Sequence, residues 1–517
     1  MKRILFFLLA TTALTGCYKD KSSDRYDPIG SISITGIESR YNVTSFIDVL
    51  TISPVVTSTD PGDKPADFDY LWTLFSNDLG SGSAVTFRPP DTLAHGKGAK
   101  DLSYAVTLSP GSYTVQLQAL NTLNGYSVFA TTTIIVNTEF STGYYFLKET
   151  AEGNTELDFL SPSGNLAANL LEAKLGSPII GPPTRLGYFT NYSYMDDETG
   201  SFVPCKALVP MGGRDCKVMK VEDMSLIYDH KTLFYGDEDR DEKPLMAFSE
   251  TLFSRPYYVS NLGLYSSNQM PSMGTYGTGK FGLPIDPPGG LDLSPHNVVV
   301  SSGSGTMMFN FFDEREGNLI YYNYNYALQT LTSDNGFSPT GINRTLLFMG
   351  TNGWAVFQDK ANPQERFIYR LSLTAVRNPI TLVEAINPSL NFAKAQVYGS
   401  NKSGATGMLY AGVGDKLYMY NTAVHTNPDF TGDVETLLSP QGIESGEVIT
   451  MITHKPAAPA LYLMIATYKS GTYKVYMFTL SGGAPSGDPV IVASGQGKVV
   501  DIQYAYTGSS YSYIVNY

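Results

Sequence analysis

Hydrophobic and polar residues alternate in short runs along most of the chain, and turn-forming residues separate the runs. In residues 110–121, a Pro-Gly pair leads into strict alternation that places Tyr113, Val115 and Leu117 on one face. Alternation with a period of two predicts a half-buried β-strand. Comparable runs occur at residues 31–34, 48–52, 70–74, 105–108 and 132–136. About seven short strands between residues 29 and 137 predict a two-sheet immunoglobulin-like sandwich.

A second pattern follows the polar stretch 138–142 and extends to the C-terminus. Four short apolar runs carry a tyrosine in the same place, and the spacings between these tyrosines are 48, 49 and 58 residues: Tyr321, Tyr369, Tyr418 and Tyr476. A period near 50 residues, with several strands in each unit, is typical of β-propeller blades. We therefore predict an all-β chain in which residues 143–517 form a β-propeller-like domain of about seven blades, with six or eight also compatible. A pair of unrelated β-sandwiches is the alternative.

Three segments of the second region differ from the repeated strands: a short helix, a long insertion and a final strand. Residues 165–175 have leucines at helical spacing and are followed by Gly176, which predicts one short helix. Residues 254–296 are rich in Pro, Gly, Ser and Met, so we expect a long insertion between blades, where ligand binding is common. Residues 510–515 are predicted to close the ring by pairing with residues 144–147, because closure hides the sheet edges.

The first residues combine a basic start, an apolar run and the tetrapeptide Leu14-Thr15-Gly16-Cys17. This order predicts a secretory signal that is too short to span a bilayer as a mature helix. The tetrapeptide resembles the bacterial lipobox, in which the cysteine is lipidated and becomes the new N-terminus. We predict a signal peptide at residues 1–16, a lipid anchor at Cys17 and a polar stalk at residues 17–28. An ordinary cleaved signal with a chance cysteine is the alternative.

Charge and cysteine content restrict the possible partners. The net charge of −13 and the pI of about 4.9 argue against nucleic acid, because a surface that follows phosphates needs clustered Lys and Arg. After the anchor, only Cys205 and Cys216 remain, and they form either one disulfide or two unpaired thiols. Two cysteines are too few for a metal-thiolate site, which needs about four ligands.

Motifs for catalysis or for cofactors are incomplete in this sequence. Residues 274–280 come close to a phosphate-binding loop, but Phe281 stands where a Ser or Thr must hold magnesium. The acidic run 237–242 lacks the glycine and the final carboxylate of a calcium loop, and the five histidines have no metal-ligand spacing. We therefore assign no catalytic residue, metal or cofactor. Trp354 is the first aromatic residue to test for ligand contact, although a core position is favoured for it.

The hairpin at residues 110–125 resembles the PKD (polycystic kidney disease-type) module. Its pattern is matched by Pro110, Gly111, Tyr113, Val115, Leu117, Asn121 and Gly125. Trp72 falls where the module carries its core tryptophan. The usual Gly-Asp-Gly after the tryptophan strand is absent, so the resemblance implies the fold and carries over no ligand role.

The lipobox, the PKD-like hairpin and the β-repeat region together resemble the PKD-like family lipoproteins of Bacteroidetes. The resemblance rests on Cys17, the 110–125 hairpin and the segments 143–147 and 157–159. It implies a surface-exposed outer-membrane lipoprotein that binds either nutrient, in the form of peptide or glycan, or partner proteins, as an accessory of a TonB-dependent Sus-type importer and its lid lipoprotein. It names no ligand-binding residue. The alternatives are a surface hydrolase with carboxylates on the propeller face, and an adhesin.

Overall fold

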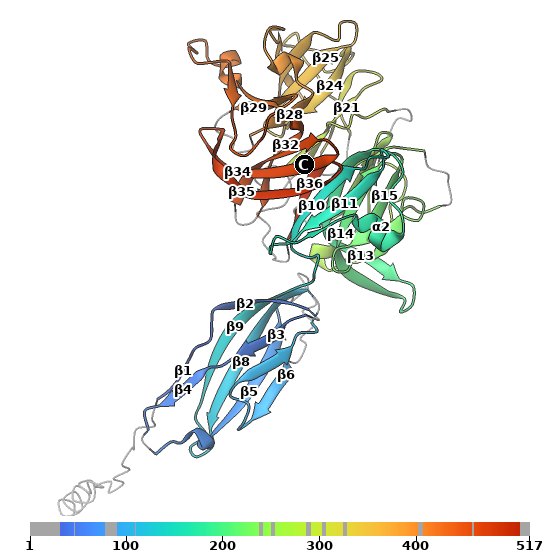
Figure 1. The fold of residues 1–517 in the computed structure, drawn as a ribbon. Coiled ribbons are helices and arrows are strands. Elements are labelled where there is room, and N and C mark those ends of the chain that lie inside the picture. The colour runs from blue at the N-terminus through green and yellow to red at the C-terminus, as the bar shows by residue number, and fades with distance from the viewer. Residues whose placement is uncertain are drawn as a thin grey trace, which may run out of the picture.

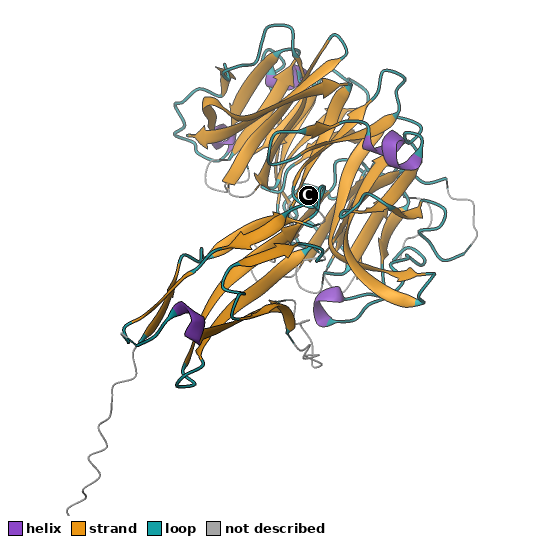
Figure 2. Ribbon diagram, turned by 60° about the horizontal axis from the view of Figure 1, so that its bottom comes forward, coloured by secondary structure: helices purple, strands orange, loops and turns teal. Residues whose placement is uncertain are grey.

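The computed structural model describes residues 31–506, except for residues 46, 61, 78–89, 109, 237–240, 250–253, 286–290, 302–306, 324–327, 402–406 and 458–459. The described chain is nearly all-β, as predicted, and Figure 2 shows only a few short helices among the strands. Strands β1–β9 and strands β10–β36 form two separate sets of sheets in the described residues. Figure 1 shows the first set as an elongated unit below the second.

The first unit contains one five-stranded sheet and two strand pairs. The large sheet has the order β2 (Arg40–Thr44), β9 (Ser127–Asn137), β8 (Gly111–Asn121), β5 (Phe68–Ser76) and β6 (Asp91–Gly96). The pairs are β1 (Ile32–Thr35) with β4 (Val55–Ser58), and β3 (Val49–Ile52) with β7 (Leu102–Ala105). Trp72 is fully buried in the core of this unit, as predicted, and its indole Nε1 donates to the Ala99 carbonyl at 2.9 Å.

Strand β8 follows the alternation of the sequence, because Val115, Leu117 and Ala119 are all fully buried. The strand predicted at residues 105–108 is wrong in its position. Strand β7 ends at Ala105, and its register with β3 places Leu102, rather than Ala105, in the core.

The chain enters and leaves the first unit at opposite ends. The Ser31 carbonyl accepts from the Thr59 N–H. Asp63, four residues after Thr59, accepts from the Asn121 side-chain amide at 2.8 Å, so Ser31 lies at the Asn121 end of the unit. The exit is at Asn137, whose carbonyl accepts from the Ser45 N–H at 2.7 Å. Asn121 and Asn137 are at opposite ends of the β8–β9 hairpin, which Figure 1 shows running along the unit. Strand β9 has 11 residues and spans about 35 Å.

The second unit consists of small antiparallel sheets that follow one another along the chain, and we number them 1 to 7. Sheet 1 contains β36 (Lys498–Ala505), β10 (Gly143–Glu149), β11 (Thr155–Leu160) and β12 (Leu166–Ala167); sheet 2 contains β13 (Pro183–Asp196), β14 (Ser201–Gly212), β15 (Asp215–Lys220) and β16 (Leu226–Asp229). Sheet 3 contains β17 (Pro244–Ser249), β18 (Pro256–Ser260) and β19 (Gly263–Ser266), and one parallel pair, Tyr188 with Phe248, joins it to sheet 2.

Sheets 4 to 7 each contain four consecutive strands. They are β20 (Val298–Ser301) to β23 (Leu328–Gln329), β24 (Arg344–Met349) to β27 (Ile380–Ala385), β28 (Val397–Ser400) to β31 (Glu435–Leu438), and β32 (Val448–Ala457) to β35 (Ala484–Gln496). The four tyrosines with a spacing near 50 residues lie in the third strand of each of these sheets: β22 (Asn318–Tyr322), β26 (Arg366–Leu371), β30 (Lys416–Asn421) and β34 (Thr472–Ser481). The repeat seen in the sequence is therefore a repeat of structure.

Hydrophobic cores lie between successive sheets of the second unit. Each core joins one sheet to the next, through pairs such as Tyr145 and Leu186, Cys216 and Tyr258, Phe248 and Phe309, Phe312 and Phe357, Trp354 and Tyr420, and Tyr410 and Ile465. A last core packs sheet 7 against sheet 1 and includes Phe146 and Tyr473, whose ring centroids are 6.0 Å apart. The sequence of contacts thus returns to the sheet at which it began.

Strand β36 brings the end of the described chain into sheet 1. It pairs with β10 on the edge opposite β11, with Tyr144 facing Tyr504 and Phe146 facing Ile502. Figure 1 shows the red β36 beside the teal β10. The prediction that residues 510–515 pair with residues 144–147 is therefore wrong, because β11 and β36 occupy both edges of β10. Residues 507–517 themselves lie outside the described residues.

Asp501 connects the closing strand to both neighbouring sheets. Its carboxylate accepts from the Leu186 N–H of β13 at 3.0 Å and from the Lys455 ammonium of β32 at 2.9 Å. Lys455 also donates to the Ile502 carbonyl at 2.9 Å. Burial raises the pKa of Asp501, but the charges of Lys455 and Arg185 and the two hydrogen bonds outweigh burial and lower it. The ionised carboxylate therefore fixes sheets 7, 1 and 2 together.

The predicted helix at residues 165–175 is shorter than expected. Helix α2 covers Leu170–Leu175, and Leu166–Ala167 instead forms β12 on the edge of sheet 1. Asn169 has a left-handed backbone with φ of 55°, which interrupts the helical path before Leu170. Gly176 ends the helix with φ of 83°, as the sequence predicted. Across the part of the chain that the structure describes, no helix has the length and apolar character to cross a membrane.

We predict that Asp501→Asn lowers the free energy of unfolding at neutral pH by about 3 kcal/mol, because the Lys455 charge loses its partner. Because the folded pKa of Asp501 is lowered, its contribution is present above the unfolded aspartate pKa of about 3.9 and is lost as the pH falls through the folded value. Urea unfolding of both proteins between about pH 7 and about pH 3 should show the difference shrinking on acidification.

The control for this experiment is Asp433→Asn, which changes an exposed carboxylate in a loop. It should leave the unfolding curves close to those of the unmodified protein at each pH. A difference between Asp501→Asn and the unmodified protein that stays constant down to about pH 3 would contradict the assigned role.

Candidate functional site

An open cleft of about 490 Å³ lies beside strands β13 and β16 of sheet 2. It is lined by Tyr194, Met195, Asp196, Asp197, Glu198, Leu226, Ile227, Tyr228, Tyr235, Thr278 and Lys280. These residues come from three places in the sequence: the tip of the long β13–β14 hairpin, strand β16 with the loop after it, and residues 278–280. The volume falls within the range of about 300–1,000 Å³ that is usual for ligand pockets.

The hairpin tip forms the acidic wall of the cleft. Asp196 is used by the turn itself, because its carboxylate accepts from the Glu198 N–H at 3.0 Å and from the Thr199 N–H at 2.8 Å. Bonds from the backbone and hydroxyl of Thr199 lower the pKa of Asp196. Asp197 and Glu198 follow in the turn and are exposed. Two carboxylates at the tip are thus directed to solvent around the cleft.

Two tyrosines on the opposite wall are held in place by Thr278. The Tyr228 hydroxyl donates to the Thr278 carbonyl at 2.6 Å, and the Tyr235 hydroxyl is hydrogen-bonded to the Thr278 hydroxyl. Tyr235 is 54% exposed, although its hydroxyl is fixed. The Lys280 ammonium lies 5.3 Å from the centroid of the Tyr228 ring. Burial raises the pKa of Tyr228 to about 12, so the phenol is neutral at physiological pH.

Residues 277–280 are anchored on strand β13. Ser193, which is fully buried, accepts from the Gly277 N–H and donates to the Gly277 carbonyl, both at 3.0 Å. Tyr192 donates to the Gly279 carbonyl at 3.0 Å. Gly279 has φ of 79°, and a Cβ there would collide with the Tyr192 hydroxyl, so only glycine brings the loop this close. Thr278 and Lys280 are therefore positioned rigidly.

The segment 254–296, expected to be an irregular insertion, is more ordered than predicted. Strands β18 and β19 occupy its first part and belong to sheet 3, and only the later part supplies Thr278 and Lys280 to the cleft. The phosphate-loop-like residues 274–280 precede no helix, since Phe281 pairs with Phe234 and Ser267 as isolated bridges.

Cys205 and Cys216 are free and buried, so the possible disulfide does not form in this structure. Cys205 faces Tyr192 across strands β13 and β14, whereas Cys216 faces Met211 six positions further along β14. Six strand residues correspond to about 20 Å, which exceeds the roughly 7 Å that separates bridged Cα atoms. Burial raises the pKa of both thiols.

The remaining sequence candidates are structural or lie outside the described residues. Trp354 is only 3% exposed and packs between sheets 5 and 6, with the Arg370 guanidinium 4.9 Å from its ring centroid. Cys17 and residues 237–240 lie outside the described residues, and Asp241 beyond them pairs with Arg214. Among the residues placed by the structure, no group of three or more His, Cys, Asp and Glu residues could hold a metal.

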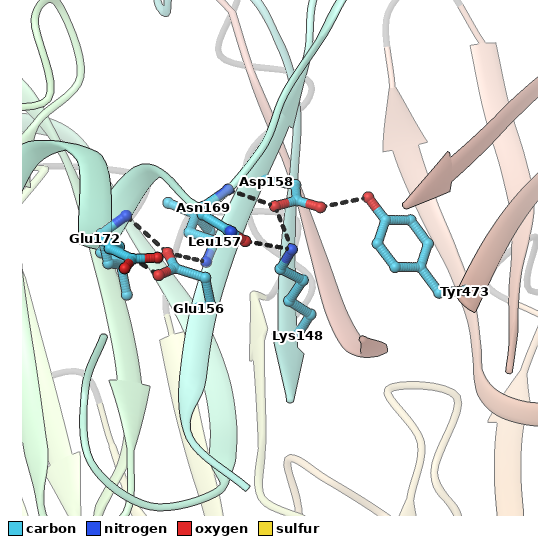
Figure 3. Close-up of polar contacts among 8 residues, drawn as sticks. Lys148, Glu156, Leu157, Asp158, Asn169, Glu172 and Tyr473 are labelled. Atoms are coloured by element: carbon cyan, nitrogen blue, oxygen red, sulfur yellow. Dashed lines mark hydrogen bonds and ion pairs between the residues drawn. The ribbon is translucent and has the colours of Figure 1, made fainter. Parts of the chain in front are cut away.

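A buried polar network that the sequence did not reveal joins sheet 1 to sheet 7. The Lys148 ammonium lies 2.7 Å from the Asp158 carboxylate, and their side chains are 2% and 0% exposed. Lys148 also donates to the Asn169 side chain at 2.8 Å. Asp158 accepts from the Asn169 N–H at 2.9 Å and from the Tyr473 hydroxyl of β34 at 2.7 Å, as Figure 3 shows.

The neighbouring Glu156 holds the start of helix α2. Its carboxylate accepts from the backbone N–H groups of Leu157, Leu171 and Glu172 at 2.7–3.1 Å (Figure 3). Glu156 directly precedes the segment 157–159, which includes Asp158 and on which the family resemblance partly rests. Both carboxylates are almost completely buried and their bonds are satisfied within the protein. This segment therefore stabilises the fold and does not offer a binding surface.

Comparisons with known proteins support the predicted lipoprotein signal and the predicted PKD-like domain. The model of the PKD-like family matches residues 17–183, and the model of the prokaryotic membrane lipoprotein lipid attachment site matches residues 1–17. The chain carries a PKD-like family domain and a lipoprotein attachment site. It is a lipid-anchored membrane lipoprotein, and the PKD-like domain includes the β-sandwich described above. No curated protein matches the sequence.

Solved structures similar to this chain are distant. A quinonprotein alcohol dehydrogenase-like protein from Bacteroides thetaiotaomicron has 13% identity and a TM-score of 0.36, over 93% of this chain and 100% of its own. Hydrazine synthase of Kuenenia stuttgartiensis has 11% identity and a TM-score of 0.35, over 67% and 98%. PorZ of Porphyromonas gingivalis, a surface component of the type-IX secretion system, has 9% identity and a TM-score of 0.31, over 77% and 53%. The fold described above follows from strand pairing within this chain.

We predict that Tyr473→Phe lowers the free energy of unfolding by about 1.5–3 kcal/mol, because the buried Asp158 carboxylate loses a hydroxyl donor. Tyr418→Phe, in a third strand of the neighbouring sheet 6, is the matched control and should change it by less than about 0.5 kcal/mol. Urea unfolding measures both. If both substitutions changed the free energy of unfolding equally, the hydrogen bond from Tyr473 to Asp158 would make no special contribution to stability.

The two free thiols should react with iodoacetamide only slowly in the folded protein, because burial keeps them protonated and inaccessible. After denaturation without reductant, mass spectrometry should find both Cys205 and Cys216 alkylated. Resistance to alkylation until reductant is added would instead reveal a disulfide.

Proposed function

We propose that residues 143–517 form a seven-bladed β-propeller and that residues 29–137 form the sandwich that carries it. The cyclic order of the cores supports this proposal, since sheet 7 packs against sheet 1 just as each sheet packs against the next. Strand β36 supports it further, because a blade built from both ends of a domain is the usual means of closing a propeller ring.

We propose that the protein is a surface-exposed outer-membrane lipoprotein that acts as an accessory of a TonB-dependent Sus-type importer. Its ligand is a nutrient in the form of a peptide or a glycan. The observation that carries the proposal is the placement of entry and exit at opposite ends of the sandwich. Because Ser31 and Asn137 lie at opposite ends, the sandwich separates Ser31, the first described residue after the anchor segment, from the start of the second unit by about 35 Å. The cleft on sheet 2 is the site that we propose for the ligand.

Binding is favoured over hydrolysis by the state of the carboxylates in the cleft. Glycoside hydrolysis uses a carboxylic acid with a raised pKa opposite a second carboxylate. Asp196 has a lowered pKa and is occupied by its turn, while Asp197 and Glu198 are exposed at the hairpin tip. This arrangement suits recognition by hydrogen bonds.

The tagged lipoprotein, purified in mild detergent from membranes of its own host, tests the proposed partner. Mass spectrometry should identify a TonB-dependent channel and its lid lipoprotein among the chains that co-purify. A variant in which an ordinary cleaved secretory signal replaces residues 1–17, so that the lipid anchor is lost, is the control for membrane attachment and should be released in soluble form. Recovery of the anchored protein alone would overturn the importer role.

A further inference from the structure

We propose that the cleft on sheet 2 binds a neutral oligosaccharide, with the exposed ring of Tyr235 as the platform for one sugar ring. This inference rests on the proposed binding function and names the class of ligand for that site. It follows from three properties of the walls: a rigid exposed aromatic ring, exposed acceptors and a nearby ammonium group.

Tyr235 has the properties of a stacking platform. Its side chain is 54% exposed, yet its hydroxyl is bonded to Thr278, so the ring keeps one orientation without a ligand. Thr278 is in turn held by the Tyr228 hydroxyl and by the anchored loop around Gly279. A pre-oriented aromatic ring offers a large contact area at a small cost in conformational entropy. The apolar C–H face of a sugar ring matches such a surface.

The charged groups around this ring offer both acceptors and a donor. The carboxylates of Asp197 and Glu198 accept hydrogen bonds, and the ammonium of Lys280 donates them. A sugar hydroxyl is both donor and acceptor, so a polyhydroxylated ligand can use all three groups.

An anionic ligand fits the same walls less well, because it would be repelled by the three acidic residues of the hairpin tip, Asp196, Asp197 and Glu198. A cationic side chain would be attracted by these carboxylates, but it would be repelled by Lys280, whose ammonium already lies over the Tyr228 ring. The open form of the cleft also leaves room for a chain of sugars to extend into solvent. A neutral oligosaccharide is therefore favoured over an acidic peptide, and lysine-rich peptides in the test decide against a cationic ligand.

The test uses the full-length lipidated protein in mild detergent. It is applied to an array of neutral plant, fungal and host oligosaccharides, together with lysine-rich and acidic peptides. The best-bound oligosaccharide is then titrated by calorimetry. Tyr235→Ala should weaken its binding at least about tenfold, because the stacking surface is lost. Tyr235→Phe keeps the ring and should stay within about threefold of the unmodified protein.

The matched control is Tyr126→Ala, which removes a tyrosine of the sandwich that is 40% exposed and far from the cleft in the sequence. It should leave the affinity unchanged, and thermal unfolding should show that each variant remains folded. Affinity for a neutral sugar should also vary little between about 0.05 M and about 1 M salt, whereas binding of a charged peptide would fall steeply.

Two results would overturn the inference: the absence of oligosaccharide binding on the array, or sugar binding that Tyr235→Ala leaves intact. Binding of peptides without binding of any oligosaccharide would also overturn it. The outcome is independent of the importer experiment, because co-purification with a channel does not require the cleft, and sugar binding does not require the channel.

Discussion

The pairing of β36 with β10 is the interaction on which the second unit depends. Without it, β10 would expose an unpaired edge, and sheet 7 would lose the contacts of Val499 and Ile502 in the core that it shares with sheet 1. Main-chain bonds alone do not fix the position of β36 between two other sheets. Asp501 does so, since its carboxylate joins the backbone of β13 on one side to Lys455 of β32 on the other. The Asp158–Tyr473 bond adds a second connection between sheets 1 and 7.

Sheets that pack in this order leave their exposed hairpin tips available for variation. The residues between successive sheets are buried aromatic and aliphatic side chains, and substitutions there change the packing of two sheets at once. The cleft residues Tyr194, Ile227 and Tyr228 pack against the core between sheets 2 and 3, whereas Asp197 and Glu198 at the hairpin tip are exposed. The cleft therefore combines a rigid support with exposed tip residues whose replacement leaves that packing intact.

The sequence predicted those features whose signal is local or periodic. The strict alternation in β8, the glycine that ends α2 and the equivalent tyrosines of sheets 4 to 7 all depend on neighbouring residues or on a fixed period. The third strand of sheet 2, β15, carries no tyrosine, and Tyr265 in the third strand of sheet 3 stands in a strand of only 4 residues, β19. Lys148 and Asp158 could not be recognised as buried, because charged residues in a strand usually face solvent and their burial depends on Tyr473, more than 300 residues away. The cleft draws on three distant segments, and only residues 254–296 were singled out beforehand.

Strands β10 and β36, which pair in sheet 1, are far apart in the sequence, and this separation also governs the order in which the chain folds. The sandwich is complete once residue 137 is available, so it can form before the second unit does. Sheet 1 must wait for residues 498–505, about 350 positions after β10, and contacts of such long range form slowly. The folding chain therefore spends a period with a folded N-terminal unit and an unfinished second unit whose first strand can pair with other chains. Products truncated before residue 498 remain in that state and become targets for aggregation or proteolysis.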